Sequence, residues 1–574
     1  MKTRFIYIAL AALAAAQSAT AGVWDELAIL ARGDSEREFV LDKYNFLQPT
    51  AYTSGLFFDY DNDGCLDLLI MGKGGDWNVP ASNRFMLLYH NQGPEAYYAF
   101  RPVADTGLAQ AADDGYYNPV SAGDFDRDGY VDLLVMSNDG SRHVDLYLNQ
   151  KGTGRFVNAN LGLHGASNGS VMLADLDGDG WLDIEYSGYA DDTATALKLY
   201  RNNHDLTVSD ISADAVTGAF QGQSTVADIN GDGRLDIISC GNGDNWVCLS
   251  QIYLNQGADA SGKCSWKKVV ESESSLKGAS RANPLVVDLN GDGRMDMVIN
   301  GEPSDGSGYR TRIYYGRADG TFELDATYPI VAVNQDGGIN MADRNGDGNM
   351  DIIVGGYLGT NDGDVSRYSA PLRVYDNTGA QNTRPEAPSS VTARQEEDRI
   401  VIEWEEGSDA ESAREALRYN VMVRNDRTGT VAMLIPADAS TGRLLVGTDL
   451  QTSLGAAART YSIATMGSGS YTVGVQTLDQ AYAPSAFRTL TLDVASVEGV
   501  EAQQSGMAMT LNGKNLEVTT SRDATVEVYT PDGRLLTVAQ AFAPCSGVDI
   551  EARGLVVVKV SGADGSLVEK FIVK

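Results

Sequence analysis

Six short acidic segments of this chain have the residue types and spacing that bind a hard metal ion. They read DYDNDGCLD from Asp59, DFDRDGYVD from Asp124, DLDGDGWLD from Asp175, DINGDGRLD from Asp228, DLNGDGRMD from Asp288 and DRNGDGNMD from Asp343. In each segment, carboxylate or amide side chains occupy positions 1, 3, 5 and 9, and glycine at position 6 permits a tight turn. A backbone carbonyl at position 7 completes an all-oxygen set, which suits Ca²⁺ and its flexible coordination.

We therefore expect about six structural Ca²⁺ ions, one in each segment. The expected side-chain ligands are Asp59, Asp61, Asp63 and Asp67; Asp124, Asp126, Asp128 and Asp132; Asp175, Asp177, Asp179 and Asp183; Asp228, Asn230, Asp232 and Asp236; Asp288, Asn290, Asp292 and Asp296; and Asp343, Asn345, Asp347 and Asp351. The alternative for one such segment is a solvated hairpin turn. Six copies in one register favour metal, because like charges a few ångströms apart repel by about 1 kcal/mol per pair even in a water-like dielectric.

The elements that position these segments form a repeat. The segments start 51 to 65 residues apart, and each lies between short apolar runs such as GLFF and LDLLIMG. A third, aromatic run (LYLNQ, IYLNQ, RVYDN) and a Gly-rich turn with a fourth run usually follow. Four short strands per repeat are typical of a propeller blade. The sequence predicts an all-β chain with a six-bladed propeller, whose last blade is completed by residues 33–42. A seven-bladed propeller is the alternative.

These repeats resemble FG-GAP (VCBS) repeats, the calcium-loop propeller units of the integrin alpha-chain head and of many secreted bacterial proteins. The resemblance covers about residues 33–380, within a propeller domain expected at residues 22–380. Residues 381–495, with DRIVIEWEE and GSYTVGVQTLD, resemble a fibronectin type III-like β-sandwich, with Trp404 and Tyr419 in its core and a spacer role. Residues 496–574, with Tyr529, Asp532-Gly533-Arg534 and Gly554, are expected to form a second β-sandwich that resembles the C-terminal sorting domain of type IX secretion cargo, which implies that secretion machinery as a partner. The alternative is an ordinary small β-sandwich.

Charge and the N-terminus restrict the location and the partners. The 574 residues carry 44 Lys+Arg against 78 Asp+Glu, a net charge of −34, which disfavours nucleic acid and anionic lipid as partners. Residues 1–21 read as a secretory signal peptide, with Lys2 and Arg4 before an apolar run and Ala19-Thr20-Ala21 at its end. No later run is long enough to span a membrane. We expect a secreted or surface protein that crosses the periplasm and outer membrane of a Gram-negative bacterium.

Two tryptophans mark the expected ligand-binding face. Trp77 and Trp246 each follow position 9 of an acidic segment by ten residues, so they lie at the blade end opposite the calcium loops. The expected site contains Trp77, Asp76, Asn78, Trp246, Asp244, Asn245, Tyr117 and Arg281. An exposed indole beside polar groups suits stacking on a sugar, although packing between blades is an alternative role. We expect a glycan or an extracellular protein as the ligand.

The sequence favours recognition over catalysis. Its four histidines, His90, His143, His164 and His204, share no motif, and no catalytic triad or zinc-ligand pattern is present. A secreted polysaccharide lyase or hydrolase on a calcium-stabilised propeller is the alternative. The five cysteines do not form a disulfide framework, although Cys240 could pair with Cys248 or Cys264.

Overall fold

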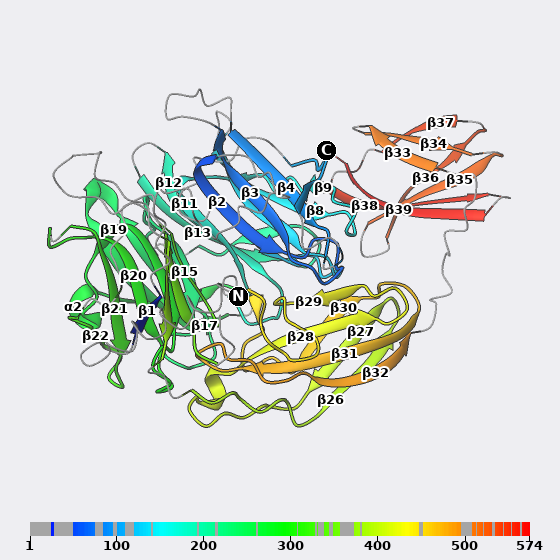
Figure 1. The fold of residues 1–574 in the computed structure, drawn as a ribbon. Coiled ribbons are helices and arrows are strands. Elements are labelled where there is room, and N and C mark those ends of the chain that lie inside the picture. The colour runs from blue at the N-terminus through cyan, green and yellow to red at the C-terminus, as the bar shows by residue number, and fades with distance from the viewer. Residues whose placement is uncertain are drawn as a thin grey trace, which may run out of the picture.

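The computed structural model of this chain is all-β, with almost no helix (Figure 1). It describes residues 24–27 and 50–573, apart from longer gaps at 75–83, 96–99, 109–119, 331–337, 344–347, 356–371, 447–451 and 495–507 and from gaps of one to three residues. The short helical elements within the described residues include η3 (Asp244–Trp246), α2 (Glu271–Ser274) and η5 (Arg414–Ala416).

Residues 50–377 form six antiparallel repeat units, each with an acidic segment between its first two strands. Unit 1 contains β2 (Thr50–Phe58), β3 (Asp67–Gly74), β4 (Arg84–Asn91) and β5 (Phe100–Pro102). Unit 2 contains β6 (Val120–Gly123), β7 (Asp132–Asn138), β8 (Arg142–Asn149), β9 (Phe156–Asn158) and β10 (Leu163–His164). Unit 3 contains β11 (Ser167–Ala174), β12 (Asp183–Asp191), β13 (Ala194–Asn202) and β14 (Val208–Asp210).

The remaining units follow the same order. Unit 4 contains β15 (Ser224–Ala227), β16 (Asp236–Asn242), β17 (Cys248–Ala258) and β18 (Cys264–Val269). Unit 5 contains β19 (Ala279–Val287), β20 (Asp296–Pro303), β21 (Arg310–Gly316) and β22 (Phe322–Leu324). Unit 6 contains β23 (Gly338–Ala342), β24 (Asp351–Gly355) and β25 (Leu372–Asn377). Units 4 and 5 join through the pairing of Leu249 with Ala279.

An N-terminal strand completes unit 6, but it is not the segment that the sequence predicted. Strand β1 (Trp24–Leu27) pairs antiparallel with β25, with Trp24 opposite Asn377. Strand β24 takes the other edge of β25, so both edges of β25 are paired. Residues 33–42, which the sequence predicted for this role, lie outside the described residues. The prediction failed because edge pairing uses backbone groups that many segments can offer, so the side-chain pattern did not select the right one.

Apolar side chains pack between consecutive units. Leu69 of unit 1 and Leu133 of unit 2 share one buried cluster, and Leu134 of unit 2 and Ile184 of unit 3 share another. Similar clusters join units 3 and 4, units 4 and 5, and units 5 and 6. The first strands β2, β6, β11, β15, β19 and β23 contact one another in this order. The units are therefore stacked side by side with their first strands innermost.

Two further pairs of sheets follow. The middle segment, residues 382–494, has one sheet of β26 (Val391–Glu396), β27 (Arg399–Trp404) and β30 (Thr460–Ala464), and one of β29 (Val431–Met433), β28 (Arg418–Asn425), β31 (Gly469–Leu478) and β32 (Arg488–Val494). The C-terminal segment, residues 508–573, has β33 (Ala508–Asn512), β34 (Asn515–Thr519) and β37 (Cys545–Asp549), and β36 (Leu535–Ala541), β35 (Ala524–Tyr529), β38 (Gly554–Gly562) and β39 (Gly565–Val573). Trp404 and Tyr419 are buried with ring centroids 5.5 Å apart, which confirms their predicted core role.

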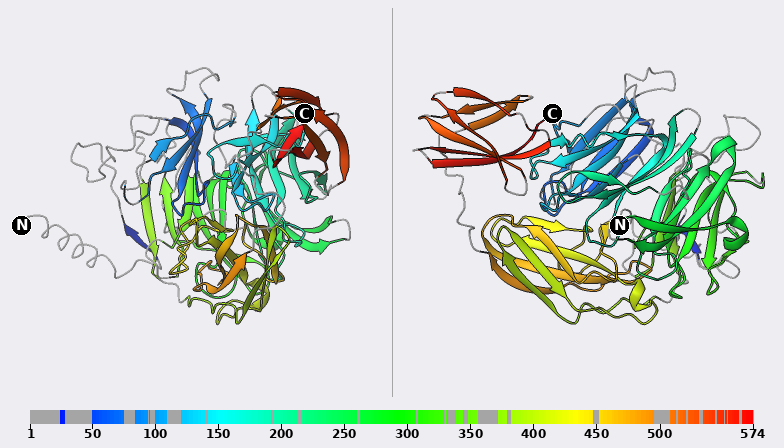
Figure 2. Two further views of the ribbon diagram at one scale, coloured as in Figure 1. Left: turned by 90° about the vertical axis from the view of Figure 1, so that its right-hand side faces the viewer. Right: turned by 180° about the vertical axis from the view of Figure 1, so that it is seen from behind.

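The middle segment lies against the repeat units (Figure 2). Its position is set by backbone contacts, since the Val431 N–H donates to the Asn62 carbonyl and the Ala464 N–H donates to the Arg127 carbonyl. Asn62 and Arg127 belong to acidic segments, so this domain covers the acidic loops. The sequence-based interpretation of a spacer is wrong, because a fibronectin-like pattern specifies a core and says nothing of what the outer surface contacts.

Candidate metal centres

The aspartate at position 9 anchors each acidic loop to its unit. All six, Asp67, Asp132, Asp183, Asp236, Asp296 and Asp351, are at most 2% exposed. In unit 1, Asp67 Oδ2 accepts the Tyr60 N–H at 3.1 Å and Oδ1 accepts the Asn91 N–H at 2.8 Å. The carboxylate thus joins the start of the loop to the end of the third strand. The same two contacts recur in units 2 to 5.

An asparagine at the end of the third strand links neighbouring units, a role that the sequence pattern did not predict. Asn149 is 4% exposed, and its Nδ2 donates to the Tyr60 carbonyl of unit 1 at 2.8 Å and to the Val131 carbonyl of its own unit at 3.0 Å. Asn202, Asn255 and Asn377 donate in the same way to the preceding unit. The asparagine is present in the runs LYLNQ, IYLNQ and RVYDN, as the fourth residue of the first two and the last residue of the third.

The loops have the geometry of oxygen-ligand turns. The carboxylate of Asp59 at position 1 accepts the N–H groups of Asp63 at 3.1 Å and Gly64 at 2.8 Å, and Asp124 holds positions 5 and 6 of its loop equally. Glycine at position 6 has positive φ, as in Gly64 with φ of 85°. This bend turns the side chains at positions 1, 3 and 5 toward one another.

Three loops bring carboxylate oxygens within 4.8 Å of one another. The groups are Asp59, Asp61 and Asp63; Asp124, Asp126 and Asp132; and Asp175, Asp177 and Asp183. Asp61 Oδ1 is buried and has no hydrogen-bond partner among the described residues. Such an oxygen in an acidic cluster fits a metal ligand, because an unpaired buried oxygen is otherwise costly. In the other loops, Asp228, Asp288 and Asp343 hold position 1, and Asn345 and Asp347 lie outside the described residues.

Burial and mutual repulsion disfavour the ionised form of these carboxyl groups when no metal balances them. Desolvation, with a smaller contribution from neighbouring carboxylates, raises the pKa of Asp59 to about 8 and that of Asp67 to about 8. The same causes raise the pKa of Asp175 to about 7 and those of Asp236 and Asp296 to about 8. A divalent cation would remove this penalty, because an adjacent positive charge favours the ionised carboxylate.

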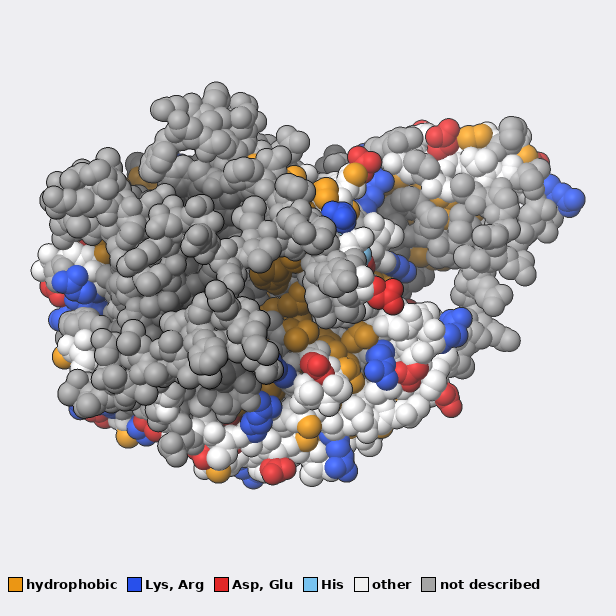
Figure 3. All heavy atoms as spheres, in the orientation of Figure 1, with side chains coloured by type: hydrophobic (Ala, Val, Ile, Leu, Met, Phe, Trp, Pro, Cys, Tyr) orange, Lys and Arg blue, Asp and Glu red, His pale blue; other side chains and the backbone are white. Residues whose placement is uncertain are grey.

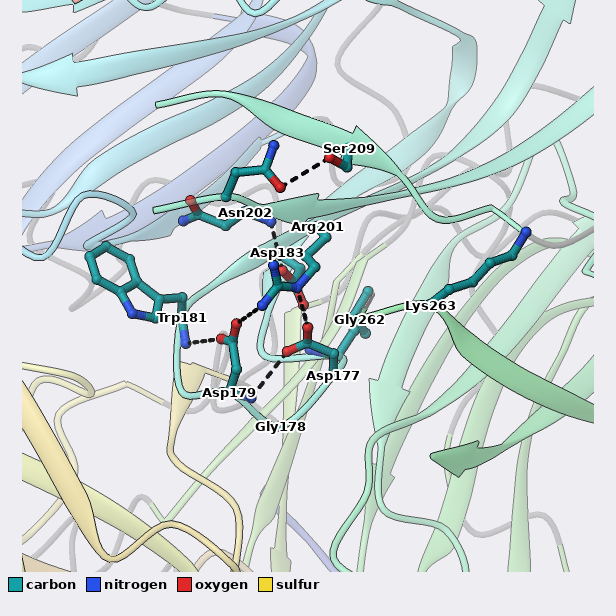
Figure 4. Close-up of polar contacts among 12 residues, drawn as sticks. Asp177, Gly178, Asp179, Trp181, Asp183, Arg201, Asn202, Ser209, Gly262 and Lys263 are labelled. Atoms are coloured by element: carbon teal, nitrogen blue, oxygen red, sulfur yellow. Dashed lines mark hydrogen bonds and ion pairs between the residues drawn. The ribbon is translucent and has the colours of Figure 1, made fainter. Parts of the chain in front are cut away.

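The protein's own cations already neutralise part of this charge. Arg201 Nε lies 2.6 Å from Asp177 Oδ2, and its Nη2 lies 2.6 Å from Asp179 Oδ2 (Figure 4). His90 Nδ1 lies 3.1 Å from Asp67 and 3.4 Å from Asp61. Arginine at position 7 pairs with the position 5 aspartate in two loops, Arg234 with Asp232 and Arg294 with Asp292. Those two loops carry asparagine, Asn230 and Asn290, at position 3 and so have one negative charge fewer.

Among the expected ligand-binding residues, Trp246 is the most exposed large hydrophobic side chain described, at 66%. Its ring meets Phe220 edge-on at 5.0 Å, and Phe220 lies 4.9 Å from Tyr189. Asp244 and Asn245 share the turn η3 with Trp246, and Asp244 Oδ1 accepts the Thr195 N–H at 3.0 Å. The indole therefore projects from a fixed aromatic and polar base.

Of the other expected site residues, Arg281 is described by the structure and four are not. The guanidinium of Arg281 lies 2.9 Å from the Tyr309 hydroxyl and 3.5 Å from the Glu302 carboxylate. Trp77, Asp76, Asn78 and Tyr117 lie outside the described residues. All five cysteines are free, and Cys240 pairs across the strands with Ser250, so the possible Cys240–Cys248 disulfide does not form.

Comparison with known proteins identifies the repeats. Residues 59–135, 124–184, 228–299 and 288–354 match the FG-GAP-like repeat, and these four stretches include all six acidic segments. Cartilage acidic protein 1 of Mus musculus is 26% identical over 232 residues, which is 39% of this chain and 34% of that protein. The Homo sapiens protein of the same name is 26% identical over 233 residues, 39% of this chain and 33% of its own length. The chain spans about a third of the length of these curated relatives.

Solved structures resemble the chain only distantly. A fungal alcohol oxidase of the AA5 family, in complex with copper, aligns with 77% of this chain and 99% of its own, with a TM-score of 0.35 and 11% identity. The FN1–FN3 domains of chicken CNTN1 align with 39% of this chain and 75% of their own, with a TM-score of 0.14 and 11% identity. Within the described residues, no helix has the length and apolar character needed to cross a membrane.

Proposed function

We propose that this chain is a secreted or cell-surface recognition protein built on a calcium-stabilised, six-bladed β-propeller. The six repeat units are the blades, the middle and C-terminal segments are two small β-sandwiches, and the signal peptide and the type IX-like tail direct export. The observation that carries the metal assignment is the convergence of three carboxylates within 4.8 Å in each of three FG-GAP-like loops. Bound Ca²⁺ would supply the positive charge that lets these turns keep their shape.

The ligand-binding face in this proposal is the end of the units opposite the acidic loops. Strand β16 begins at Asp236 and has 7 residues, so the turn that follows it lies about 20 Å from the acidic loop of the same unit. The acidic end is covered by the middle segment, which leaves the opposite end for a partner. Trp246 is exposed there at 66%, next to Asp244 and Asn245.

A glycan or an extracellular protein fits this face. The indole offers a flat apolar surface, and the neighbouring carboxylate and amide can orient hydroxyl or peptide groups. Net charge of −34 argues against nucleic acid. Arg281 lies in unit 5 and forms an ion pair with Glu302, so it contributes a positioned charge to the same end of the units.

A glycan and extracellular-matrix array, read for binding and for released sugar products, tests this function. Wild-type protein in Ca²⁺ should bind a defined ligand class, and Trp246→Ala should reduce binding at least tenfold. Phe542→Ala is the matched control, because Phe542 is also exposed, at 59%, but belongs to the C-terminal segment. Equal binding by wild type and Trp246→Ala would reject this site. Product release would instead support an enzyme.

A further inference from the structure

The middle segment contacts the acidic loops at the positions whose shape a metal would set. The N–H of Val431 donates to the carbonyl of Asn62 at 3.1 Å, and the N–H of Ala464 donates to the carbonyl of Arg127 at 3.1 Å. Asn62 and Arg127 are position 4 of the first and second loops, and both have positive φ, 58° and 55°. Position 4 lies between the predicted ligands at positions 3 and 5.

A second contact joins two loops to the middle segment through one side chain. Arg127 is 7% exposed, and its guanidinium lies 4.3 Å from the centre of the Trp181 ring and 4.9 Å from that of the Tyr461 ring. Trp181 is position 7 of the third loop, and Tyr461 belongs to β30 of the middle segment. A cation between two aromatic rings is favourable only while both rings keep their places.

The position 6 glycines are also part of this interface. The open side of Gly129 faces Ile463 of the middle segment, and the open side of Gly293 faces the carbonyl of Glu411 so closely that any side chain would collide. The fifth loop adds a backbone bond, since the Asp288 N–H donates to the Gln480 carbonyl at 3.0 Å. Gln480 is 2% exposed. Positions 1, 4 and 6 of the loops therefore form the docking surface.

The repeat units and the middle segment are in close contact, but a cavity remains between them. Apolar side chains are visible in the hollow between the repeat units and the middle segment (Figure 3). A cavity of about 210 Å³ separates the third and fourth loops from the middle segment and is lined by Asp177, Arg234, Arg418 and Ala458 among others. The middle segment has its own buried cluster around Tyr419 and Val473. Three of its other side chains, Ile435, Leu478 and Tyr482, belong to the buried cluster of units 5 and 6, so opening the joint exposes these three and leaves the cluster around Tyr419 intact.

We propose that these loops form a calcium-dependent joint: metal in the loops holds the middle segment on the repeat units, and loss of metal releases it. This inference rests on the proposed calcium binding. Without a cation, the carboxylates of each loop repel one another and the bend through positions 3 to 6 relaxes. Because that bend is the docking surface, docking weakens. By linkage, docking must raise calcium affinity by the factor with which calcium favours docking.

Hydrogen exchange of the full mature chain, with and without a calcium chelator, tests this joint. The amides of Val431 and Ala464 report docking directly, because their partners are loop carbonyls. Chelation should speed exchange in peptides containing these amides at least tenfold. Peptides from the parts of β28 and β31 that form the middle segment's own cluster, Val421–Val423 and Tyr471–Val475, should keep their protection. Metal content is measured by elemental analysis on the same samples.

A variant on the middle segment tests the reciprocal effect. Ala416 is 4% exposed and lies against Gly231 of the fourth loop, so Ala416→Arg should prevent docking without changing a loop residue. It should weaken calcium affinity about tenfold, which corresponds to about 1.4 kcal/mol. Thr491→Arg adds the same charge on the exposed face of β32 and should change neither property. Protection of β28 and β31 confirms that each variant is folded.

The outcomes separate this inference from the proposed function. If calcium is bound and removed while the Val431 and Ala464 amides keep their protection, the joint is refuted and calcium binding stands. If Ala416→Arg exposes these amides but leaves calcium affinity unchanged, the coupling is refuted. If the wild-type protein binds no calcium at millimolar concentration, the proposed metal function itself fails.

Discussion

Replacing Asn149 by alanine should destabilise the repeat region far more than its single side chain suggests. The change removes two hydrogen bonds from Nδ2, to Tyr60 and Val131, and one from the Gly152 N–H to Oδ1 at 2.9 Å. At about 1 kcal/mol per bond, with a further penalty for the buried carbonyls left without a donor, the expected loss is about 3 to 5 kcal/mol. For a region of this size the melting temperature should fall by about 5 to 10 °C.

Calorimetry of the mature chain in saturating Ca²⁺ measures this loss. Gln150→Ala is the matched control, because Gln150 is the adjacent residue, carries the same amide and is exposed. Asn149→Asp separates lost volume from lost donation, since it keeps the size but sets an anion against two carbonyl oxygens, so it should destabilise at least as much. A melting temperature for Asn149→Ala within 1 °C of that for Gln150→Ala would refute the role of this asparagine in joining units.

Three other outcomes follow from the charges of the structure. Because burial raises the pKa of Asp67 to about 8, calcium binding should release protons, and calcium affinity should weaken as pH falls from 8 to 6. Titration calorimetry in two buffers of different ionisation enthalpy measures this proton release. A binding heat that is the same in both buffers would contradict it. Burial raises the pKa of Glu185 from 4.5 to about 8, so between pH 4.5 and 8 the native state keeps this carboxyl protonated while the unfolded state loses the proton. The free energy of unfolding should therefore fall as pH rises through this range, by up to about 1.4 kcal/mol per pH unit. Glu185→Gln should flatten this pH dependence, and an unchanged slope would contradict it. Arg201→Ala should lower the melting temperature by several degrees in chelator and by less in Ca²⁺, because metal replaces the lost charge on Asp177, whereas equal shifts in both conditions would contradict this.

The repeat and its acidic loops could be predicted because their signals are local. Asp, Asn and Gly at fixed positions dictate a turn, and six turns in one register dictate six strand units. The asparagine that ends the third strand is just as local, but its partner is a backbone carbonyl of the previous unit, about 80 to 90 residues earlier, as for Asn149 and Tyr60. Every residue has a backbone carbonyl, so the sequence does not indicate which carbonyl accepts the hydrogen bond of this asparagine.

Two failures have a common cause. The strand that completes unit 6 is Trp24–Leu27 and not residues 33–42, and the middle segment packs on the loops instead of acting as a spacer. Both depend on which surfaces meet at long sequence separation, through backbone groups such as the amides of Val431 and Ala464. The side-chain pattern specifies each element but not its neighbour. For Trp246 the sequence left two roles open, an exposed stacking surface and packing between blades. The side chain is 66% exposed and contacts Phe220 edge-on, and its role in ligand binding stays a prediction.

The central claim is that divalent metal in the acidic loops stabilises this fold. The direct measurement is calcium stoichiometry of the purified mature chain by elemental analysis, paired with calorimetry before and after chelation. We predict about six bound Ca²⁺ per chain and a melting temperature at least 10 °C lower after chelation. A protein that binds no metal and melts at the same temperature in chelator would contradict the account.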